Sequence, residues 1–294
     1  MPSPSAGVIP VDKPRGVTSR RVVDVVARAL GTKAVGHAGT LDPLASGVVV
    51  ACVGPATRLV DFLHALPKRY VASFLLGRSS PSDDLETPVE EQPDPPRPDR
   101  AGVETALAGF RGDILQRPCD YSAVHVGGQR AYAVARKGRP VELAAKPVRI
   151  DRLEITSYDW PRLGLAIECS SGTFVRAIGR DLALALGTRA VMESLVRESV
   201  GPFSRSASIP LDAISPDTVA AAILPALAAV AHLPRATLAG PMLDAAVRGG
   251  LVDLPAPLAA ALAVAAVDEA GTLVGILARH DSGRHRLRPN FRGG

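Results

Sequence analysis

The segment that most constrains the fold of this 294-residue chain is VVVACVG, from Val48 to Gly54. Its unbroken run of mostly β-branched apolar residues, bounded by glycines, is typical of a buried strand. The stretch before it, GHAGTLDPLASG from Gly36 to Gly47, surrounds one aspartate, Asp42, with three glycines and a proline. Pro43 biases Asp42 toward an extended or turn conformation, and the glycines permit close approach of a ligand. We therefore expect a rigid strand to hold a loop that presents the Asp42 carboxylate.

The remaining periodicities predict an α+β fold. Apolar residues at helical spacing predict a helix from Ser19 to Leu30, with Ser19 as N-cap and Gly31 as its end. A second helix follows the turn from Ser170 to Gly172 and ends at Gly187. Further strands are predicted at Val8–Val11, Lys68–Gly77 and Leu163–Cys169. Strands and helices interleave irregularly, without the steady alternation of a parallel sheet, which favours the α+β class.

Composition divides the chain into two domains. An alanine-rich stretch, predicted to be helical, ends at His232, and turn signals at residues 268–271 and 281–283 then indicate β-hairpins. We expect a first domain at residues 1–231 and a compact β module at residues 232–294. Within the first domain, residues 79–100 are acidic and proline-rich, which predicts an exposed, mobile loop without regular structure.

Charge and cysteine content limit the classes of function. The net charge of +5 and the isoelectric point near 9.4 favour an anionic partner, of which nucleic acid is the commonest. The three cysteines lack CxxC spacing, so neither a disulfide framework nor a metal site is expected, and a reducing cytoplasm fits best. We expect no membrane span and no secretion signal.

Several ordered blocks, between about residues 6 and 205, resemble one family. GHAGTLDPLASG is similar to the catalytic signature of the TruB family, the bacterial tRNA pseudouridine-55 synthases. Other matching blocks are DKPRGVTS (12–19), KRY (68–70), PCDYSAVHVGGQRAYAVARKG (118–138), SSGTFVRAIGRDL (170–182) and LVRESVGPF (195–203). The resemblance implies a mixed, largely antiparallel sheet flanked by helices, followed by a small C-terminal β-barrel of the PUA type.

The resemblance also implies a chemistry and its residues. Asp42 matches the nucleophile that attacks ribose C1′ or uracil C6, or that assists a glycal route, and no cofactor is implied. Arg176 matches the arginine that pairs with this aspartate, although it could instead be a surface arginine paired with Asp181. Tyr70 is expected to pack on the extruded uracil or help remove its C5 proton, and Leu195 is the expected apolar contact beneath the base.

A second group of residues is implied in RNA binding. His37 matches the histidine that packs against the T-loop where the base departs. Phosphate contacts are expected from Lys13, Lys68, Arg69 and Arg136, although Lys13 could instead support the active-site loop. The implied partner is the T-stem-loop of tRNA, bound by a monomer without an obligatory protein partner. The C-terminal module is expected to grip the acceptor arm.

The chain departs from the family pattern at two places. RSSPSDDLET replaces a threonine-rich T-x-T-x-D-x-x-G segment, and PCDYSA with His125 replaces PPxYSA with a lysine. Because the acidic residues 79–100 would repel phosphate, we expect this loop to swing aside or to lie on the far face. Two alternatives remain, a non-catalytic tRNA-folding chaperone and a catalytic subunit of a guide-RNA particle.

Overall fold

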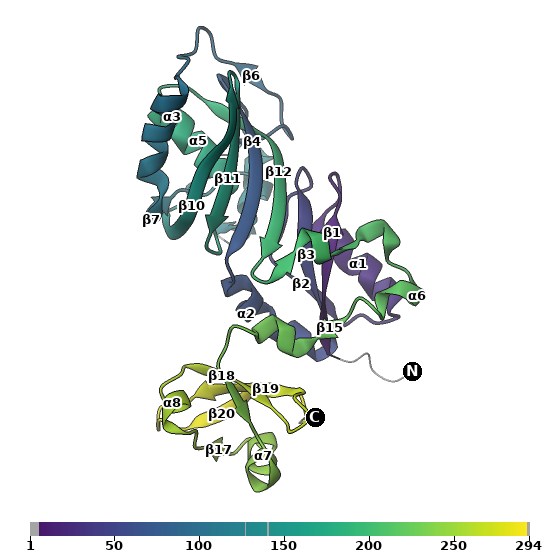
Figure 1. The fold of residues 1–294 in the computed structure, drawn as a ribbon. Coiled ribbons are helices and arrows are strands. Elements are labelled where there is room, and N and C mark those ends of the chain that lie inside the picture. Colours follow the sequence, from purple (N-terminus) through teal and green to yellow (C-terminus); the bar gives the residue numbers. More distant parts are fainter. Residues whose placement is uncertain (1–5, 127, 140, 293–294) are drawn as a thin grey trace.

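The first sheet forms the body of the molecule. The computed structural model describes residues 6–126, 128–139 and 141–292, and Figure 1 shows their arrangement. In these residues eleven strands join in one sheet, whose main path runs β14-β1-β3-β12-β4-β11-β10-β7. The bounds along this path are β14 Ile209–Pro210, β1 Gly7–Lys13, β3 Ser46–Val53, β12 Ala190–Val200, β4 Lys68–Leu76, β11 Arg162–Cys169, β10 Lys146–Asp159 and β7 Gly112–Gln116. The side strands are β2 Val35–Ala38, β13 Phe203–Ser204 and β15 Leu224–Pro225.

Strand pairing confirms a mixed, largely antiparallel sheet. Only β1 with β14 and β12 with β3 pair in parallel, among the pairs seen in the described residues of this sheet. The β3–β12 pair brings the two backbones very close at Gly47, which has φ +104°, because a Cβ there would lie 2.3 Å from the Arg197 carbonyl oxygen. Gly47 therefore serves strand packing, and the expected role in ligand approach was wrong for this glycine.

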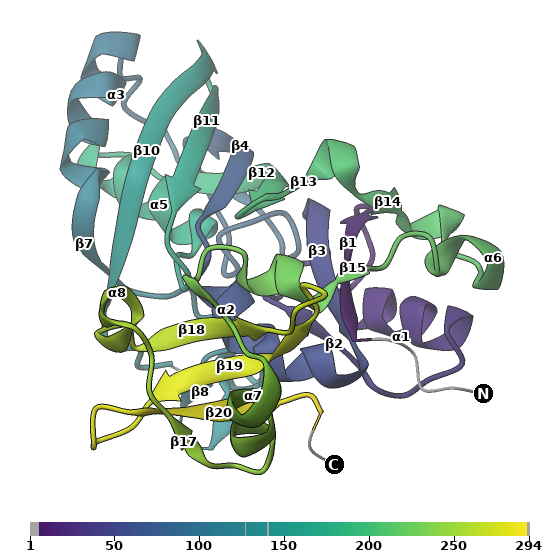
Figure 2. The same cartoon turned by 60° about the horizontal axis from the view of Figure 1, so that its bottom comes forward.

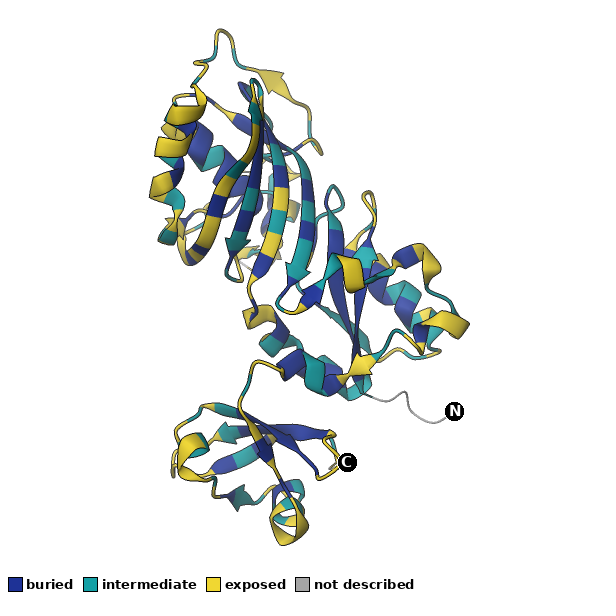
Figure 3. Cartoon of the chain, viewed as in Figure 1, coloured by how far each residue is buried: buried dark blue, intermediate teal, exposed yellow. Residues whose placement is uncertain are grey.

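The packing of strand β3 on both of its faces explains why its sequence is apolar throughout. Val49, Ala51 and Val53 belong to one core, with α1 (Ser19–Ala29), α3 (Arg100–Leu107) and α5 (Val175–Ala185). The alternate residues Val48, Val50 and Cys52 belong to a second core, on the other face. Successive strand side chains point to opposite faces, so a strand covered on both sides needs no polar positions. Figure 3 shows β1 and β3 as almost entirely buried.

Two local expectations about helices were wrong. Thr18, not Ser19, is the N-cap of α1, since its hydroxyl accepts a hydrogen bond from the Arg21 amide at 3.1 Å. The alanine-rich stretch is not one helix, because prolines interrupt it. It consists of the short helix α6 (Pro216–Val219), the strand β15 and a 3-10 helix, η5 (Ala226–Val230), whose first residue follows Pro225.

The C-terminal module is an open sheet. Its strands run in the order β16-β18-β19-β20-β17, with bounds β16 Arg235–Thr237, β17 Leu251–Val252, β18 Ala263–Val267, β19 Leu273–Arg279 and β20 His285–Asn290. The two expected hairpins are present, joining β18 to β19 and β19 to β20. The expected closed barrel was wrong, since in the described residues the edge strands β16 and β17 do not pair with each other. Two short helices, α7 (Gly240–Val247) and α8 (Ala256–Ala259), accompany this sheet.

The two sheets share a core. Ala265, Leu273 and Ile276 of the C-terminal sheet belong to the same apolar cluster as Leu59 and Leu63 of the first domain. Leu63 lies on α2 (Val60–Ala65), and Leu59 ends the 3-10 helix η1 (Gly54–Leu59). The rotated view in Figure 2 shows the C-terminal sheet in front of α2. The domain boundary at residue 231 stays a prediction.

The acidic segment differs from its expectation. Although residues 79–100 contain little regular structure beyond the pairing of β5 (Arg78–Ser79) with β6 (Glu90–Glu91), Ser82 and Asp84 are fully buried. Asp84 forms an isolated parallel bridge to Met192 on β12. The first part of this segment therefore packs against the sheet, and the expectation of a wholly exposed loop was wrong.

The remaining small elements lie in residues 108–135. They are η2 (Ala108–Phe110), the hairpin of β8 (His125–Val126) and β9 (Gln129–Arg130), and α4 (Ala131–Ala135). Two more 3-10 turns, η3 (Arg205–Ala207) and η4 (Leu211–Ala213), flank β14. Across the ranges that the structure describes, no helix combines the length and apolarity needed to cross a membrane.

Candidate active site

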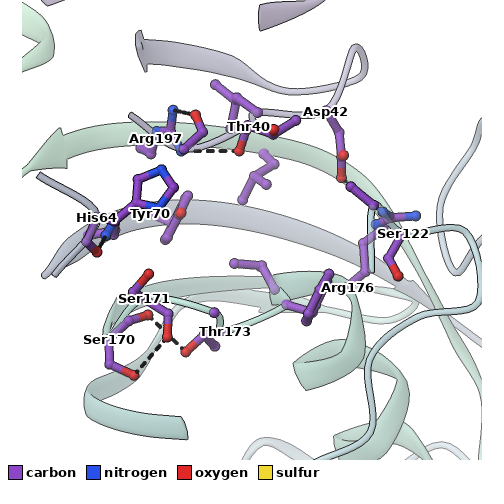
Figure 4. Close-up of a pocket in the computed structure, with 18 of the residues that line it drawn as sticks. Thr40, Asp42, His64, Tyr70, Ser122, Ser170, Ser171, Thr173, Arg176 and Arg197 are labelled. Atoms are coloured by element: carbon purple, nitrogen blue, oxygen red, sulfur yellow. Dashed lines mark hydrogen bonds and ion pairs between the residues drawn. The ribbon is translucent and has the colours of Figure 1, made fainter. Parts of the chain in front are cut away.

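A cleft of about 390 Å³ opens over the middle of the first sheet. Residues 39–42 and 170–176 form two of its walls, residues 122–124 contribute a third, and Leu195 and Tyr70 come from the neighbouring strands β12 and β4. Figure 4 shows Asp42 and Arg176 pointing toward each other at one end of this cleft. Sequence blocks that are far apart along the chain thus meet at one site.

The loop that carries Asp42 is fixed by the connection between β1 and α1. The Ser19 hydroxyl accepts a hydrogen bond from the Leu41 amide at 2.8 Å and donates to the Leu41 carbonyl at 3.1 Å. Gly16 donates its amide to the Pro43 carbonyl at 2.7 Å. Both residues that flank Asp42 are held in this way, which fixes the backbone that carries its carboxylate, and 36% of the Asp42 side chain is exposed.

Lys13 belongs to the same support. Its side chain is fully buried, and its ammonium donates to the carbonyls of Pro14, Val17 and Ala45. Burial, with a smaller effect from Arg197, lowers the pKa of Lys13 to about 8. These contacts favour the alternative that Lys13 supports the active-site loop over a phosphate contact.

Arg176 forms the expected ion pair with Asp42. The Arg176 Nη2 atom lies 3.0 Å from Asp42 Oδ2, and only 6% of the arginine side chain is exposed. The same guanidinium donates to the Ser82 carbonyl at 2.8 Å and to the Tyr121 carbonyl at 2.9 Å. Asp181, the alternative partner, pairs instead with Arg180. Arg176 is thus held by several contacts and directed at Asp42.

Asp84 is a second carboxylate at this guanidinium. Its Oδ2 lies 3.2 Å from Arg176 Nη1, although not in hydrogen-bonding alignment, and its Oδ1 accepts from the Ser82 hydroxyl and the Glu86 amide. Burial acts to lower the pKa of Arg176, but the surrounding negative groups, Asp42 first, raise it overall. The acidic segment therefore lies beside the site, and the expectation that it swings aside or lies on the far face was wrong for residues 82–86.

The serines of this segment explain how it fits. In the chain's variant RSSPSDDLET, Ser82 donates its hydroxyl to Asp84 Oδ1 at 2.5 Å, and its hydroxyl lies 2.8 Å from that of Thr87. Small hydroxyl residues can satisfy a buried carboxylate from within the same turn. In this chain the Ser82 hydroxyl therefore meets one oxygen of the buried Asp84 carboxylate from within the same segment.

Tyr70 lies in the cleft beside an arginine that the sequence analysis missed. Tyr70 on β4 is directly opposite Arg197 on β12, and both line the cleft. Burial raises the pKa of Tyr70, so its phenol is protonated at neutral pH. Arg197 donates to the Val48 carbonyl at 2.7 Å and to the Gly39 carbonyl at 3.2 Å. Its position two residues after Leu195, on the same strand face, was the signal that could have found it.

Lys68 is more buried than a phosphate contact allows. Only 5% of this residue is exposed, and its ammonium donates to the carbonyls of His64 and Leu66. Burial, with Arg197 as the second cause, lowers the pKa of Lys68 to about 8. Lys68 lines the cleft, yet its charge is already used by the turn between α2 and β4. These contacts do not favour the expected phosphate contact by Lys68.

The other sequence-predicted residues occupy different surroundings. Leu195 lies in the cleft, on strand β12 and not on a helix. His37 lies on β2, outside the residues that line the cleft, and its Nδ1 is buried without a hydrogen-bond partner in the described chain. Arg69 is exposed and paired with Glu168 at 2.9 Å. Arg136 is exposed too, and its guanidinium lies over the Tyr132 ring, 5.5 Å from the ring centroid. Arg58 lies over the Phe291 ring in the same way, at 5.1 Å.

Besides Arg197 and the buried Asp84 behind Arg176, the sequence analysis missed two further cleft residues. His64, on α2, is exposed at the cleft, and Ser122 is buried in its wall with a hydroxyl that has no partner in the described residues. Neither residue type stands out in a sequence, because an isolated histidine or serine has many structural uses. No group of three or more potential metal ligands gathers in the described ranges.

Comparison with known proteins gives one consistent result. Residues 27–175 match the model of the TruB family pseudouridylate synthase N-terminal domain. The tRNA pseudouridine synthase B of Mycobacterium sp. (strain KMS) is 43% identical over 213 residues, covering 71% of this chain and 72% of that protein. The enzyme of the same name from Arthrobacter sp. (strain FB24) is 42% identical over 205 residues, covering 68% of this chain and 67% of that protein.

A solved structure agrees with the fold. The crystal structure of the archaeal box H/ACA sRNP Nop10-Cbf5 complex contains a chain with a TM-score of 0.73, which is 23% identical and covers 98% of this chain and 86% of that one. At this identity the likeness concerns the fold alone. The matched family model includes the Asp42 loop and ends one residue before Arg176, and the relatives share 40% or more of the aligned sequence. The chain therefore belongs to the TruB family of pseudouridylate synthases.

Proposed function

We propose that this protein converts uridine 55 in the T-loop of tRNA to pseudouridine, acting in the cytoplasm as a monomer without a cofactor or an obligatory protein partner. The observation that carries the proposal is the Asp42–Arg176 ion pair of 3.0 Å at the wall of a cleft of about 390 Å³. The relatives named tRNA pseudouridine synthase B support tRNA as the substrate.

The reaction requires an anionic group beside the ribose and base. The N1–C1′ bond of uridine breaks, a C5–C1′ bond forms, and the hydrogen on C5 leaves to solvent while N1 becomes protonated. Asp42 is partly exposed and fixed by its flanking residues, so its carboxylate is available for attack at C1′ or C6, or for the glycal route. All three routes use the same carboxylate, and the geometry favours none of them.

Arg176 and Tyr70 have separate roles in this proposal. Arg176 supplies positive charge next to Asp42 when the bound base displaces water, which would otherwise favour the protonated carboxyl group. Tyr70, with its raised pKa, is suited to packing against the uracil and not to removing the C5 proton. Leu195 supplies an apolar surface in the same cleft.

Binding of the folded RNA requires the target base to leave its stack. His37, on the strand that leads into the Asp42 loop, is our candidate for the residue that packs where the base departs. Arg69 and Arg136 are exposed and remain candidates for phosphate contacts. Exposed basic residues of the C-terminal module, Arg279, Arg284, Arg288 and Arg292, are suited to gripping the acceptor arm.

Tritium release from tRNA labelled at uridine C5 tests this function. We expect the wild-type protein to release tritium, and Asp42→Asn to reduce the rate by at least about 10⁴-fold while the Kd for tRNA stays within about threefold. Transcripts with cytidine at position 55 should release no tritium from that position. A chaperone without catalytic activity would bind the same tRNA and release no tritium from it, and this result would reject the proposal.

A further inference from the structure

His64 is a cleft residue for which the proposed chemistry has no role. It lies in the last turn of α2, is exposed, and lines the cleft with Lys68, Tyr70 and Arg197. The carbonyl of His64 accepts a hydrogen bond from the Lys68 ammonium, but no side-chain hydrogen bond of its imidazole is found within the described ranges. The ring is thus free to meet a ligand.

The backbone that carries His64 is rigid. Its neighbour Leu63 is fully buried, in the apolar cluster that also contains Leu59 and Ile276. Lys68, the first residue of β4, holds the end of α2 by donating to the His64 and Leu66 carbonyls. An imidazole on such a support is held in place before a ligand binds, which reduces the ordering cost of the contact.

His64 lies away from Asp42, the proposed reactive group. In Figure 4 it lies toward Tyr70 and Arg197, whereas Asp42 and Arg176 face each other farther along the cleft. If the target uridine occupies the space between Asp42 and Tyr70, the group that reaches His64 belongs to an adjoining nucleotide. His64 also contributes to lowering the pKa of His37, after burial and Arg197.

The charge state of His64 decides what kind of group it meets. Burial, followed by the nearby Lys68 ammonium, lowers its pKa below the usual value of 6.5. A neutral imidazole offers a flat ring, one N–H donor and one acceptor nitrogen, and it lacks the positive charge that attracts phosphate. Bases of unpaired RNA stack on rings of this kind.

We propose that His64 is a specificity-determining residue whose imidazole stacks on a base next to the target uridine. The inference rests on the proposed function, because it takes the T-loop as the ligand. It adds a contact on α2, an element that the family motifs do not include, and it predicts an energetic preference for an intact base beside the target.

The direct test measures binding apart from catalysis. In an Asp42→Asn background, His64→Ala should raise the Kd for a T-stem-loop about five- to tenfold, as expected for the loss of one stacking contact. His64→Phe keeps a flat ring and should restore the Kd to within about twofold of the parent. His232→Ala is the matched control, because His232 is an exposed histidine outside the cleft, and it should leave the Kd unchanged.

A substrate series then identifies the base. T-stem-loops that are abasic on either side of the target uridine should bind more weakly to the parent, and at one position the His64→Ala variant should show no additional loss. Equal losses for His64→Ala with intact and abasic substrates at both positions would overturn the proposal. So would a failure of His64→Phe to rescue binding by folded protein with an unchanged melting temperature. Because Kd needs no turnover, these outcomes stay distinct from a failure of tritium release.

Discussion

The two sides of the cleft use buried cations in different ways. On the side of β1, β4 and β12, Lys13, Lys68 and Arg197 donate to backbone carbonyls. On the side of α5, Arg176 also donates to carbonyls but pairs in addition with the carboxylates of Asp42 and Asp84. We call these the carbonyl-bound side and the carboxylate-bound side. A cation that binds carbonyls fixes the backbone, whereas one that binds a partly exposed carboxylate can also act on the ligand.

The largest expected effect lies on the carboxylate-bound side. Arg176→Lys keeps the charge but loses the planar fork that reaches two carboxylates and two carbonyls, so we expect kcat to fall by at least about 100-fold. Single-turnover pseudouridine formation at saturating tRNA measures this. Arg180→Lys, one turn later on α5, is the control and should keep kcat within about threefold. Equal losses in both variants would show that α5 needs arginine only for folding.

The next effect concerns the stability of the same network. Asp84→Asn removes the charge of a fully buried carboxylate beside Arg176, and we expect the free energy of unfolding to fall by about 3 kcal/mol. The adjacent Asp83→Asn weakens a less buried pair with Arg180 and should cost less than about 1 kcal/mol. Urea denaturation measures both values. A smaller loss for Asp84 than for Asp83 would contradict the idea that the acidic segment supports Arg176.

The pH dependence of the unfolding free energy tests Lys13, on the carbonyl-bound side. The pKa of Lys13 is about 8 in the folded protein, against 10.5 for an unperturbed lysine. Between these values the unfolded chain binds more protons than the folded one, so the contribution of Lys13 to stability rises with pH. The unfolding free energy of the wild type minus that of Lys13→Met should therefore be flat below pH 8 and should increase from pH 8 toward 10.5. A difference that falls over this window would mean that the ammonium form is favoured by folding.

The smallest effect separates exposed from buried basic residues. Arg69→Ala should reduce the slope of log K against log salt for tRNA binding by about one, as expected for one lost phosphate contact. Lys68→Met, at the neighbouring position of β4, should leave that slope unchanged because its ammonium is bound to carbonyls. Fluorescence anisotropy at several salt concentrations measures both slopes. A reduced slope for Lys68→Met would return this lysine to the RNA-binding surface.

The sequence alone predicted the main strands and helices of the first sheet and singled out Asp42 and Arg176. The apolar run 48–54 has only one low-energy environment, a strand covered on both faces, because exposing so many β-branched side chains to water is costly. Asp42 and Arg176 were found because their surrounding blocks matched a family. The alanine-rich stretch after Val219 was interpreted wrongly as a helix, because even the high helical propensity of alanine does not overcome interruption by Pro225.

Only the tertiary structure decided how the charged residues are used. Lys13, Lys68 and Arg69 are equally basic in the sequence, but buried carbonyls bind the first two and leave the third at the surface. Likewise, the acidic composition of residues 79–100 indicates exposure, whereas Asp84 is buried because a guanidinium from α5, the Ser82 hydroxyl and the Glu86 amide offset its desolvation. Composition reports the charge of a side chain, but its role depends on partners that are distant in the chain.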